Sequence, residues 1–325
     1  MGFDLTGLLG GLLDITLPQL IMVVVGLILM GLGIFKDYEP TLLIPIGFGC
    51  ILGNLPVAAN MVGEHGLFGV LYKAGISNEL FPLLIFLGVG AMLDLRPLLS
   101  QPIMFIMGAF AHLGIFATLI VSLLLGFNLA ESTAIGMIGA IDGPTVIYVN
   151  GKLGDLFVTP GLAAAIAVTA YSYMSLVPII QPPLMRLFTT KKERGIRMEY
   201  TPRPVSRATV IIFPILITVI AAIFLPEAAP LIATLMLGNL LKESEVVPGL
   251  VETSKNAITN TATIFLGITI GSTMQAASFL NWGTLRVLIL GLVAFALNTI
   301  GGLLFGRLVC AISGRKVNPL VGAAA

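Results

Sequence analysis

The stretch Gly139-Ala140-Ile141-Asp142-Gly143-Pro144-Thr145 places a carboxylate, two glycines and a proline within an apolar run. No other charged residue occurs between positions 134 and 149. An ionisable group at membrane depth costs roughly 3 kcal/mol even on lenient insertion scales, and such groups usually mark an ion or proton path. Gly and Pro interrupt a helix and free its backbone carbonyls. The stretch therefore predicts a broken helix with a cation site at Asp142.

The composition around this stretch is that of a membrane protein. The chain has 325 residues, of which 57% are hydrophobic and 10% charged, and its mean hydropathy is +1.04. A soluble domain carries roughly 25% charged residues. The apolar runs are long and continuous instead of alternating, which predicts an all-α polytopic protein and not a β-barrel. A net charge of +1 gives no reason to expect a nucleic-acid partner.

Ten apolar runs are suitable for helices. They cover residues 17–35, 42–57, 80–93, 103–127, 132–149, 162–187, 205–225, 230–241, 257–280 and 285–310. A straight crossing needs about 20 residues, so the runs 42–57, 80–93 and 230–241 are expected to be broken, tilted or re-entrant.

Charge sets the orientation. The polar stretch 186–207 holds seven of the 17 basic residues, which predicts a cytoplasmic loop and is compatible with a docking surface for a cytoplasmic partner. The segment 1–16 has two acids and no base, and we expect it to lie at the membrane interface. The predicted units are this segment, a first membrane repeat 17–188, a basic loop 189–204 and a second repeat 205–325.

Two short motifs indicate the repeat. Leu52-Gly53-Asn54-Leu55 recurs 185 residues later, and Ile85-Phe86-Leu87-Gly88 recurs 179 residues later, in the same order. At that spacing Asp142 corresponds to the Asn, Pro and Gly of Val317-Asn318-Pro319-Leu320-Val321-Gly322. Paired interruptions in two halves point to the midplane site of a transporter. Six apolar segments separate the starts of the halves, so the repeats are parallel if all six cross and inverted if one is re-entrant. The short segments favour inversion.

Other chemistries find little support. The chain lacks a Gly-rich loop ending in Gly-Lys-Ser/Thr, and His65 and His112 are isolated, which argues against a nucleotide cradle and a zinc site. Cys50 and Cys310 lie far apart in apolar sequence and are interpreted as packed thiols.

Several motifs resemble one family, the beta subunits of the sodium-pumping, biotin-dependent decarboxylases of oxaloacetate, methylmalonyl-CoA and glutaconyl-CoA. The resemblance runs from about Ile21 to the last residue. It rests on the segments 88–94, 114–118, Asp142-Gly143-Pro144-Thr145, 151–153, 318–322 and, most specifically, the run from Tyr171-Ser172-Tyr173 to Gln181-Pro182-Pro183.

The resemblance implies a membrane subunit that decarboxylates carboxybiotin brought by a cytoplasmic carrier, takes up a proton from outside and exports Na⁺. It implies catalytic roles for Asp142 and for Tyr173 as proton donor, contacts of Tyr173, Asn318 and Gly322 with carboxybiotin, and a Na⁺ site at Asp142, with Thr145 and Asn318 as further ligands. Implied partners are a carboxyltransferase/biotin-carrier subunit and a small membrane gamma subunit, around a homotrimer in the plasma membrane of a prokaryote.

Alternatives remain open at this point. One alternative is a stand-alone Na⁺-coupled carrier of organic anions, which would share the repeats. The segments that the family has beyond Gly322 are absent, so the second repeat is expected to be truncated. The sequence would then be a fragment, or a variant that does not pump. A non-catalytic scaffold remnant is a third reading. Asp142 can instead pin two helices together, Thr145 can bond its own helix backbone, and Tyr173 can be an interfacial tyrosine.

Overall fold

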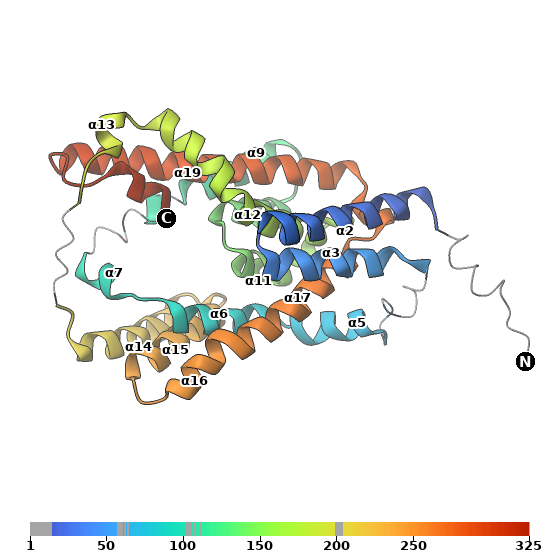
Figure 1. The fold of residues 1–325 in the computed structure, drawn as a ribbon, viewed down its shortest axis with the longest axis horizontal. Helices are drawn as coiled ribbons and strands as arrows, with labels where there is room; N and C mark the ends of the chain where they lie inside the picture. Colours follow the sequence, from blue (N-terminus) through green and yellow to red (C-terminus); the bar gives the residue numbers. More distant parts are fainter. Residues whose placement is uncertain are drawn as a thin grey trace, which may run out of the picture.

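The computed structural model describes residues 15–56, 61, 63, 65–101, 106, 108–110, 112–198 and 204–324. Every regular element in this part of the chain is helical, which confirms the predicted all-α class. The expected interfacial segment 1–16 falls almost entirely outside the described residues. In Figure 1 one group of helices, with α9, α12, α13 and α19, lies above a second group that contains α6 and α14 to α17. Helices α2 and α3 lie toward one end, and α11 lies between the groups.

Among the described residues, three helices are long and apolar enough to cross a membrane: α2 (Leu17–Lys36), α14 (Arg207–Phe224) and α19 (Trp282–Ile312). Side-chain caps start two of them, because Ser206 accepts from Thr209 N–H and Asn281 accepts from Thr284 N–H. Helices α2 and α14 keep only 17% of their most apolar window buried. Apolar surface of this extent is stable against lipid or a partner subunit, so the predicted membrane class is supported.

Each of the three short apolar runs forms one short helix, and the bend lies before one of them instead of within it. The run 80–93 is intact as α6 (Leu80–Met92), and the break precedes it, after α5 (Leu67–Leu71) and the π-helix η2 (Tyr72–Ile76). The two parts form a span bent by 56°. The helical segment 67–76 was not predicted, because its lysine and glycines lower its apolarity. Runs 42–57 and 230–241 form the short helices α3 (Pro40–Asn54) and α15 (Ala229–Ser244).

The second half repeats this irregular order. Helix α16 (Pro248–Thr253), the π-helix η5 (Ser254–Ile258) and α17 (Thr259–Thr273) follow one another as α5, η2 and α6 do. The start expected at residue 257 agrees with that of α17 at Thr259, but the helical segment before it, from Pro248, was not predicted, because a helix needs an apolar stripe and not an apolar sequence throughout. The remaining elements are α7 (Arg96–Ser100), α9 (Leu113–Leu124), α10 (Leu129–Met137), η3 (Ile138–Ala140), α11 (Gly143–Leu153), η4 (Gly154–Leu156), α12 (Leu162–Phe188), α13 (Lys191–Arg194), α18 (Ala276–Phe279) and η6 (Pro319–Ala324).

The two halves pack crosswise. Helix α3 of the first half lies on α17 of the second, and α15 of the second half lies on α6 of the first. Glycines allow both contacts: a Cβ on Gly53 would come within 3.0 Å of the backbone of Ser272, and a Cβ on Gly238 would meet the backbone of Leu87 and Ala91 equally closely. The glycines of the repeated Leu-Gly-Asn-Leu motifs are therefore positions of close backbone approach.

The asparagines of the same motifs bind the ends of the opposite helices. Asn54 Nδ2 donates to Met274 O at 2.8 Å, and its Oδ1 accepts from Ala276 N–H at 2.8 Å, where α17 ends. Asn239 Nδ2 donates to Leu93 O at 3.0 Å, where α6 ends. Each repeated asparagine therefore satisfies backbone groups that a helix end leaves free.

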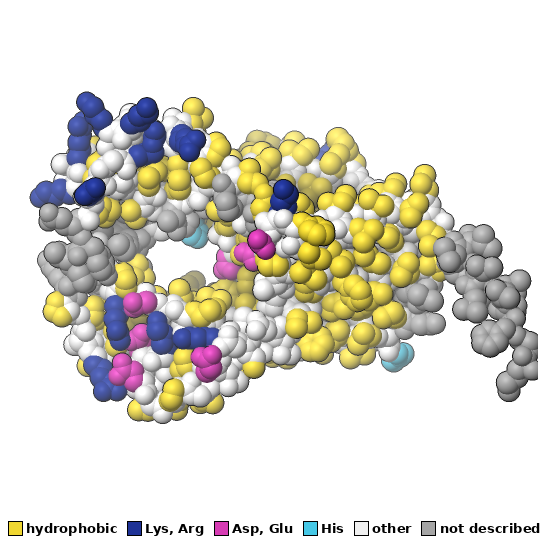
Figure 2. Space-filling model, viewed as in Figure 1, with side chains coloured by type: hydrophobic (Ala, Val, Ile, Leu, Met, Phe, Trp, Pro, Cys, Tyr) yellow, Lys and Arg dark blue, Asp and Glu magenta, His cyan; other side chains and the backbone are white. Residues whose placement is uncertain are grey.

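Charged residues gather at one end of the molecule. Figure 2 shows most Lys and Arg side chains at the end that carries α13 and the start of α14, while hydrophobic side chains cover much of the remainder. The ion pairs there include Arg96–Glu243 at 2.7 Å, Arg307–Glu193 at 3.0 Å, Arg207–Glu245 at 3.7 Å and Lys242–Glu243 at 3.9 Å. The same view is hollowed between the two groups of helices.

Candidate functional site

The predicted break at Asp142 is present. Helix α10 tightens into the 3₁₀ turn η3, Ile141 adopts a left-handed conformation (φ 58°), and Asp142 is extended before α11 begins at Gly143. Positive φ is unfavourable for a β-branched residue and persists only where the surroundings impose it, often at functional sites. The break aims the first N–H groups of α11 toward the carboxylate region, where the helix dipole favours negative charge.

Asp142 has one hydrogen-bond partner among the described residues. The Thr145 hydroxyl donates to Asp142 Oδ2 within the first turn of α11. Thr145 therefore does not simply bond its helix backbone, and no hydrogen bond or ion pair in the described part of the chain joins Asp142 to another helix. The alternative in which this carboxylate pins two helices together has no support, and the half-buried carboxylate keeps capacity for a further ligand.

The side chain next to Asp142 is Tyr171. A Cβ on Gly143 would fall within 3.0 Å of the Tyr171 ring, so the glycine is needed for this contact. Tyr171 is fully buried, and its hydroxyl has no hydrogen-bond partner among the described residues. Tyr171 is thus a neighbour of Asp142 that the sequence reasoning did not assign to the site.

Tyr173 points elsewhere, as its two-residue offset from Tyr171 predicts (about 200° on a helix). Its hydroxyl donates to Leu288 O of α19, and its ring lies against Gly291. Gly143 N–H lies 3.3 Å from Met174 Sδ, which places the start of α11 beside the same turn of α12. The Tyr-Ser-Tyr-Met run therefore touches the Asp142 break with one face and α19 with another.

The second broken segment is organised differently. Asn318 Nδ2 donates to Arg194 O and Ile196 O at 3.2 and 3.0 Å, and its Oδ1 accepts from Leu320 N–H at 3.0 Å. These bonds tie η6 to the basic loop. No hydrogen bond between Asn318 and Asp142 occurs in the described part of the chain, so the role of Asn318 as a Na⁺ ligand stays a prediction.

Both broken segments contact helix α19. A Cβ on Gly139, in η3, would lie 3.1 Å from Ala294 O. A Cβ on Gly322, in η6, would fall within 3.0 Å of Gly302 O. Ala294 and Gly302 are eight residues apart and therefore lie on about the same face of the helix. Asp142 and Gly322, far apart in sequence, thus belong to segments that contact one strip of α19.

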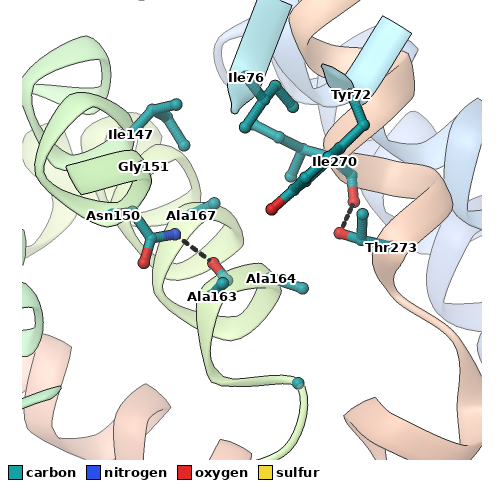
Figure 3. A pocket seen from close by; sticks show the side chains of 11 residues that line it. Tyr72, Ile76, Ile147, Asn150, Gly151, Ala163, Ala164, Ala167, Ile270 and Thr273 are labelled. Carbon is teal, nitrogen blue, oxygen red and sulfur yellow. Dashed lines mark hydrogen bonds between the residues drawn. The ribbon is translucent and has the colours of Figure 1, made fainter. Parts of the chain in front are cut away.

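A cavity of about 220 Å³ lies at the far end of α11 (Figure 3). Tyr72 of η2 directs its hydroxyl into it, Thr273 closes another side, and Asn150 of α11 donates to Ala163 O at 2.7 Å. The cavity lies at the start of α12, and the basic loop follows the end of this 27-residue helix, roughly 40 Å away along its axis. The cavity therefore faces the side opposite the basic loop.

The chemistry beside Asp142 suits a hard cation. The described residues contain no group of three or more His, Cys, Asp or Glu side chains that could hold a metal ion. The neighbouring oxygens are the Thr145 hydroxyl, which bonds the carboxylate, and the backbone carbonyls of the break. Hard cations prefer oxygen ligands of this kind.

Comparisons with known proteins agree with the resemblance seen in the motifs. Residues 18–325 match the family described as Na⁺-transporting oxaloacetate decarboxylase beta subunit. The chain is 50% identical over 314 residues to methylmalonyl-CoA decarboxylase subunit beta of Veillonella parvula, covering 97% of this chain and 82% of the relative. It is 47% identical over 314 residues to glutaconyl-CoA decarboxylase subunit beta of Acidaminococcus fermentans, with the same shares of 97% and 82%. Identity is 39% over 374 residues to the oxaloacetate decarboxylase beta chain of Klebsiella pneumoniae, covering 97% of this chain and 85% of the relative. The carrier and scaffold alternatives are thereby set aside, and the chain belongs to the beta-subunit family of the Na⁺-transporting, biotin-dependent decarboxylases, as the membrane subunit of a decarboxylase sodium pump.

Proposed function

We propose that this subunit binds Na⁺ at Asp142 and exports it while carboxybiotin, presented by a carrier subunit, loses CO₂ and one proton enters from outside. The observation that carries the proposal is the Asp142 carboxylate itself. It stands in a helix break at the start of α11, bonded only to Thr145 among the described residues. A carboxylate of this kind inside an apolar bundle needs a cation or a proton, because an unpaired buried charge is costly.

The proposed Na⁺ ligands are the Asp142 carboxylate, the Thr145 hydroxyl oxygen and backbone carbonyls of the break. The ring of Tyr171 packs against Gly143, next to Asp142, and its buried hydroxyl has no partner among the described residues. It is well suited to join the site or to donate to Asp142 when Na⁺ has left. Asn318 remains a candidate ligand only if η6 moves, because both polar atoms of its side chain are engaged in this structure.

In the chemical step, the bond between the carboxyl carbon and the ureido nitrogen of carboxybiotin breaks. CO₂ leaves, the electron pair stays on nitrogen, and that nitrogen takes a proton. Tyr173 is the proposed donor and Gly322 a proposed contact. The hydroxyl of Tyr173 bonds a backbone carbonyl of α19, the helix that also contacts both breaks. Its proton is to be replaced from the external side, and the cavity at Tyr72 and Asn150 is the proposed entry.

The energetics permit the coupling. Moving one charge across the membrane requires about 2.3 kcal/mol per 100 mV. Release of CO₂ is effectively irreversible and can drive such a move, provided that the site opens to one side at a time.

We further propose that the repeats 17–188 and 205–325, joined by the loop 189–204, are inverted. Two features support this arrangement: the crosswise packing of α3 on α17 and α15 on α6, and the matching π-helices η2 and η5. Labelling from each side of the membrane at matched positions of α2 and α14 tests this arrangement. If the repeats are inverted, the first residues of the two helices must be reached from opposite sides.

The partners follow from the family and from the surface. The exposed Lys191 and Lys192 at the basic end are proposed to receive the carboxyltransferase/biotin-carrier subunit. The exposed apolar faces of α2 and α14 are proposed to contact lipid, a small gamma subunit or neighbouring copies in a homotrimer in the plasma membrane of a prokaryote. Avidin capture of the carrier tests the first contact, and the mass of the complex in detergent tests the second.

The decisive experiment uses the complete decarboxylase complex in sealed vesicles. Wild type should show avidin-sensitive decarboxylation that Na⁺ stimulates, together with Na⁺ uptake. Asp142→Asn should abolish Na⁺ uptake and the Na⁺ stimulation, while Glu252→Gln, which neutralises an exposed acid, should retain both. Unchanged Na⁺ coupling in Asp142→Asn would sink the proposal.

A further inference from the structure

Two adjacent polar side chains are buried in the middle of α19. Asn298 and Thr299 are each 2% exposed, and neither Asn298 Oδ1 nor Thr299 Oγ1 has a hydrogen-bond partner among the described residues. Buried polar atoms are almost always paired, because burying one unpaired is unfavourable. Two unpaired oxygens on consecutive residues of an apolar 31-residue helix therefore call for a ligand.

The position of Asn298 connects these oxygens to the ion path. One turn before it, Ala294 faces Gly139 in the segment that leads to Asp142. One turn after it, Gly302 faces Gly322 in the second broken segment. Residues four apart share a helix face, so Asn298 lies on the strip of α19 between the two breaks.

Helix α9 closes this part of the strip from the other side. A Cβ on Gly114 would fall within 3.0 Å of Asn298 N and Cα, so the backbones of α9 and α19 are in direct contact there. The stacked rings of Phe110 and Phe305, 3.7 Å apart, continue the contact and show that the two helices run antiparallel. Bulk water is therefore excluded from the oxygens on this side.

The donor set is chemically specific. An amide oxygen and a hydroxyl oxygen are both neutral acceptors of the kind that hard cations prefer. The unpaired atoms are oxygens, which favour a cation, and a divalent ion would need more negative charge than this neutral pair supplies. A desolvated monovalent cation matches both properties.

We propose that Asn298 Oδ1 and Thr299 Oγ1 form a second Na⁺-binding position, on α19 between the two breaks, which the ion occupies on its way to or from Asp142. This inference rests on the proposed function, because it assumes that Na⁺ moves along the face of α19 between the two broken segments. It gives Asn298 a role in ion affinity that is separate from the chemistry at Tyr173.

The test uses the complete complex and two readouts. One is the Na⁺ concentration for half-maximal decarboxylation. The other is the rise in unfolding temperature with NaCl, with choline chloride holding ionic strength constant. Asn298→Leu removes the amide oxygen, Thr299→Val removes the hydroxyl, and Asn298→Asp keeps an oxygen and adds charge. Thr284→Val is the matched control, because Thr284 is also buried on α19 with an unpaired hydroxyl but lies near the start of the helix.

We expect Asn298→Leu to raise the half-maximal Na⁺ concentration about tenfold, which is about 1.4 kcal/mol of binding, and to flatten the thermal response. Thr299→Val should act in the same direction, Asn298→Asp should lower the half-maximal concentration, and Thr284→Val should match wild type. Affinity for carboxybiotin should not change. Wild-type Na⁺ responses in both Asn298→Leu and Thr299→Val, or equal effects in Thr284→Val, would overturn the second position. A wild-type complex without any Na⁺ response would instead refute the proposed function.

Discussion

The paired asparagines of the repeated motif allow a stability prediction with an internal control. Asn54→Ala and Asn239→Ala remove the same atoms from side chains that are 2% and 1% exposed. Asn54 bonds Met274 O and Ala276 N–H, each at 2.8 Å, and no other partner replaces it. Asn239 Nδ2 donates to Leu93 O, which also accepts from Lys242 Nζ at 2.6 Å, and makes a long bond to Gly90 O at 3.4 Å. The two substitutions therefore create similar cavities but leave different numbers of backbone groups unpaired.

The magnitudes follow from this difference. A buried donor or acceptor left without a partner costs about 1–3 kcal/mol. Asn54→Ala leaves one acceptor, Met274 O, and one donor, Ala276 N–H, without a partner. It should therefore lower the free energy of unfolding by about 2–6 kcal/mol. Asn239→Ala loses only the net value of its own bonds, about 1 kcal/mol. Equilibrium unfolding of the purified subunit in mixed detergent and SDS, at fixed pH and NaCl, measures both. Equal losses, or a larger loss for Asn239→Ala, would refute the reasoning.

Three further outcomes are expected. Gly143→Ala forces a methyl group into the Tyr171 ring and should weaken Na⁺ stimulation, whereas Gly154→Ala, where nothing lies within 4 Å, should not; equal Na⁺ responses of the two variants would contradict the packing argument. Lys152→Met breaks the ion pair with Glu79 (3.4 Å) and leaves that mostly buried carboxylate uncompensated. It should therefore destabilise the protein by about 1–3 kcal/mol. Adding Glu79→Gln should recover part of this loss in a double-mutant cycle. The backbone N–H bond at Thr190, with the Arg307 pair, lowers the pKa of Glu193, so its stabilising contribution is present above the ordinary carboxyl pKa and is lost as the pH falls through the lowered value. The stability difference between wild type and Glu193→Gln should therefore be constant near neutral pH and vanish in acid, and a difference that grew on acidification would exclude this origin.

Local sequence was sufficient for the features that depend on local chemistry. An acid beside Gly and Pro in an apolar run predicts a broken helix, because proline removes a hydrogen bond and the charge needs company whatever the surroundings. The break at Asp142 was predicted, whereas the bond from the Thr145 hydroxyl to the carboxylate, only three residues along the chain, was not. The all-α membrane class and the family follow in the same way, from composition and from contiguous motifs.

Packing decided what sequence spacing leaves open. Tyr171 and Tyr173 are equally visible in the sequence, and only the contact with Gly143 shows which of them adjoins Asp142. The sequence did not predict the bend before α6 or the helical segment that begins at Pro248. Helix ends in a bundle are set by neighbouring helices more than by local apolarity.

The sequence by itself determined that this chain is a helical membrane protein with a carboxylate in a broken segment. The tertiary structure decided what lies beside that carboxylate: the ring of Tyr171, whose buried hydroxyl is unpaired among the described residues, and the face of α19 that carries Asn298. An asparagine in an apolar helix is visible in the sequence, but its unpaired oxygen is not. Whether a polar atom finds a partner depends on contacts between residues far apart along the chain, and these exist only after the helices have packed.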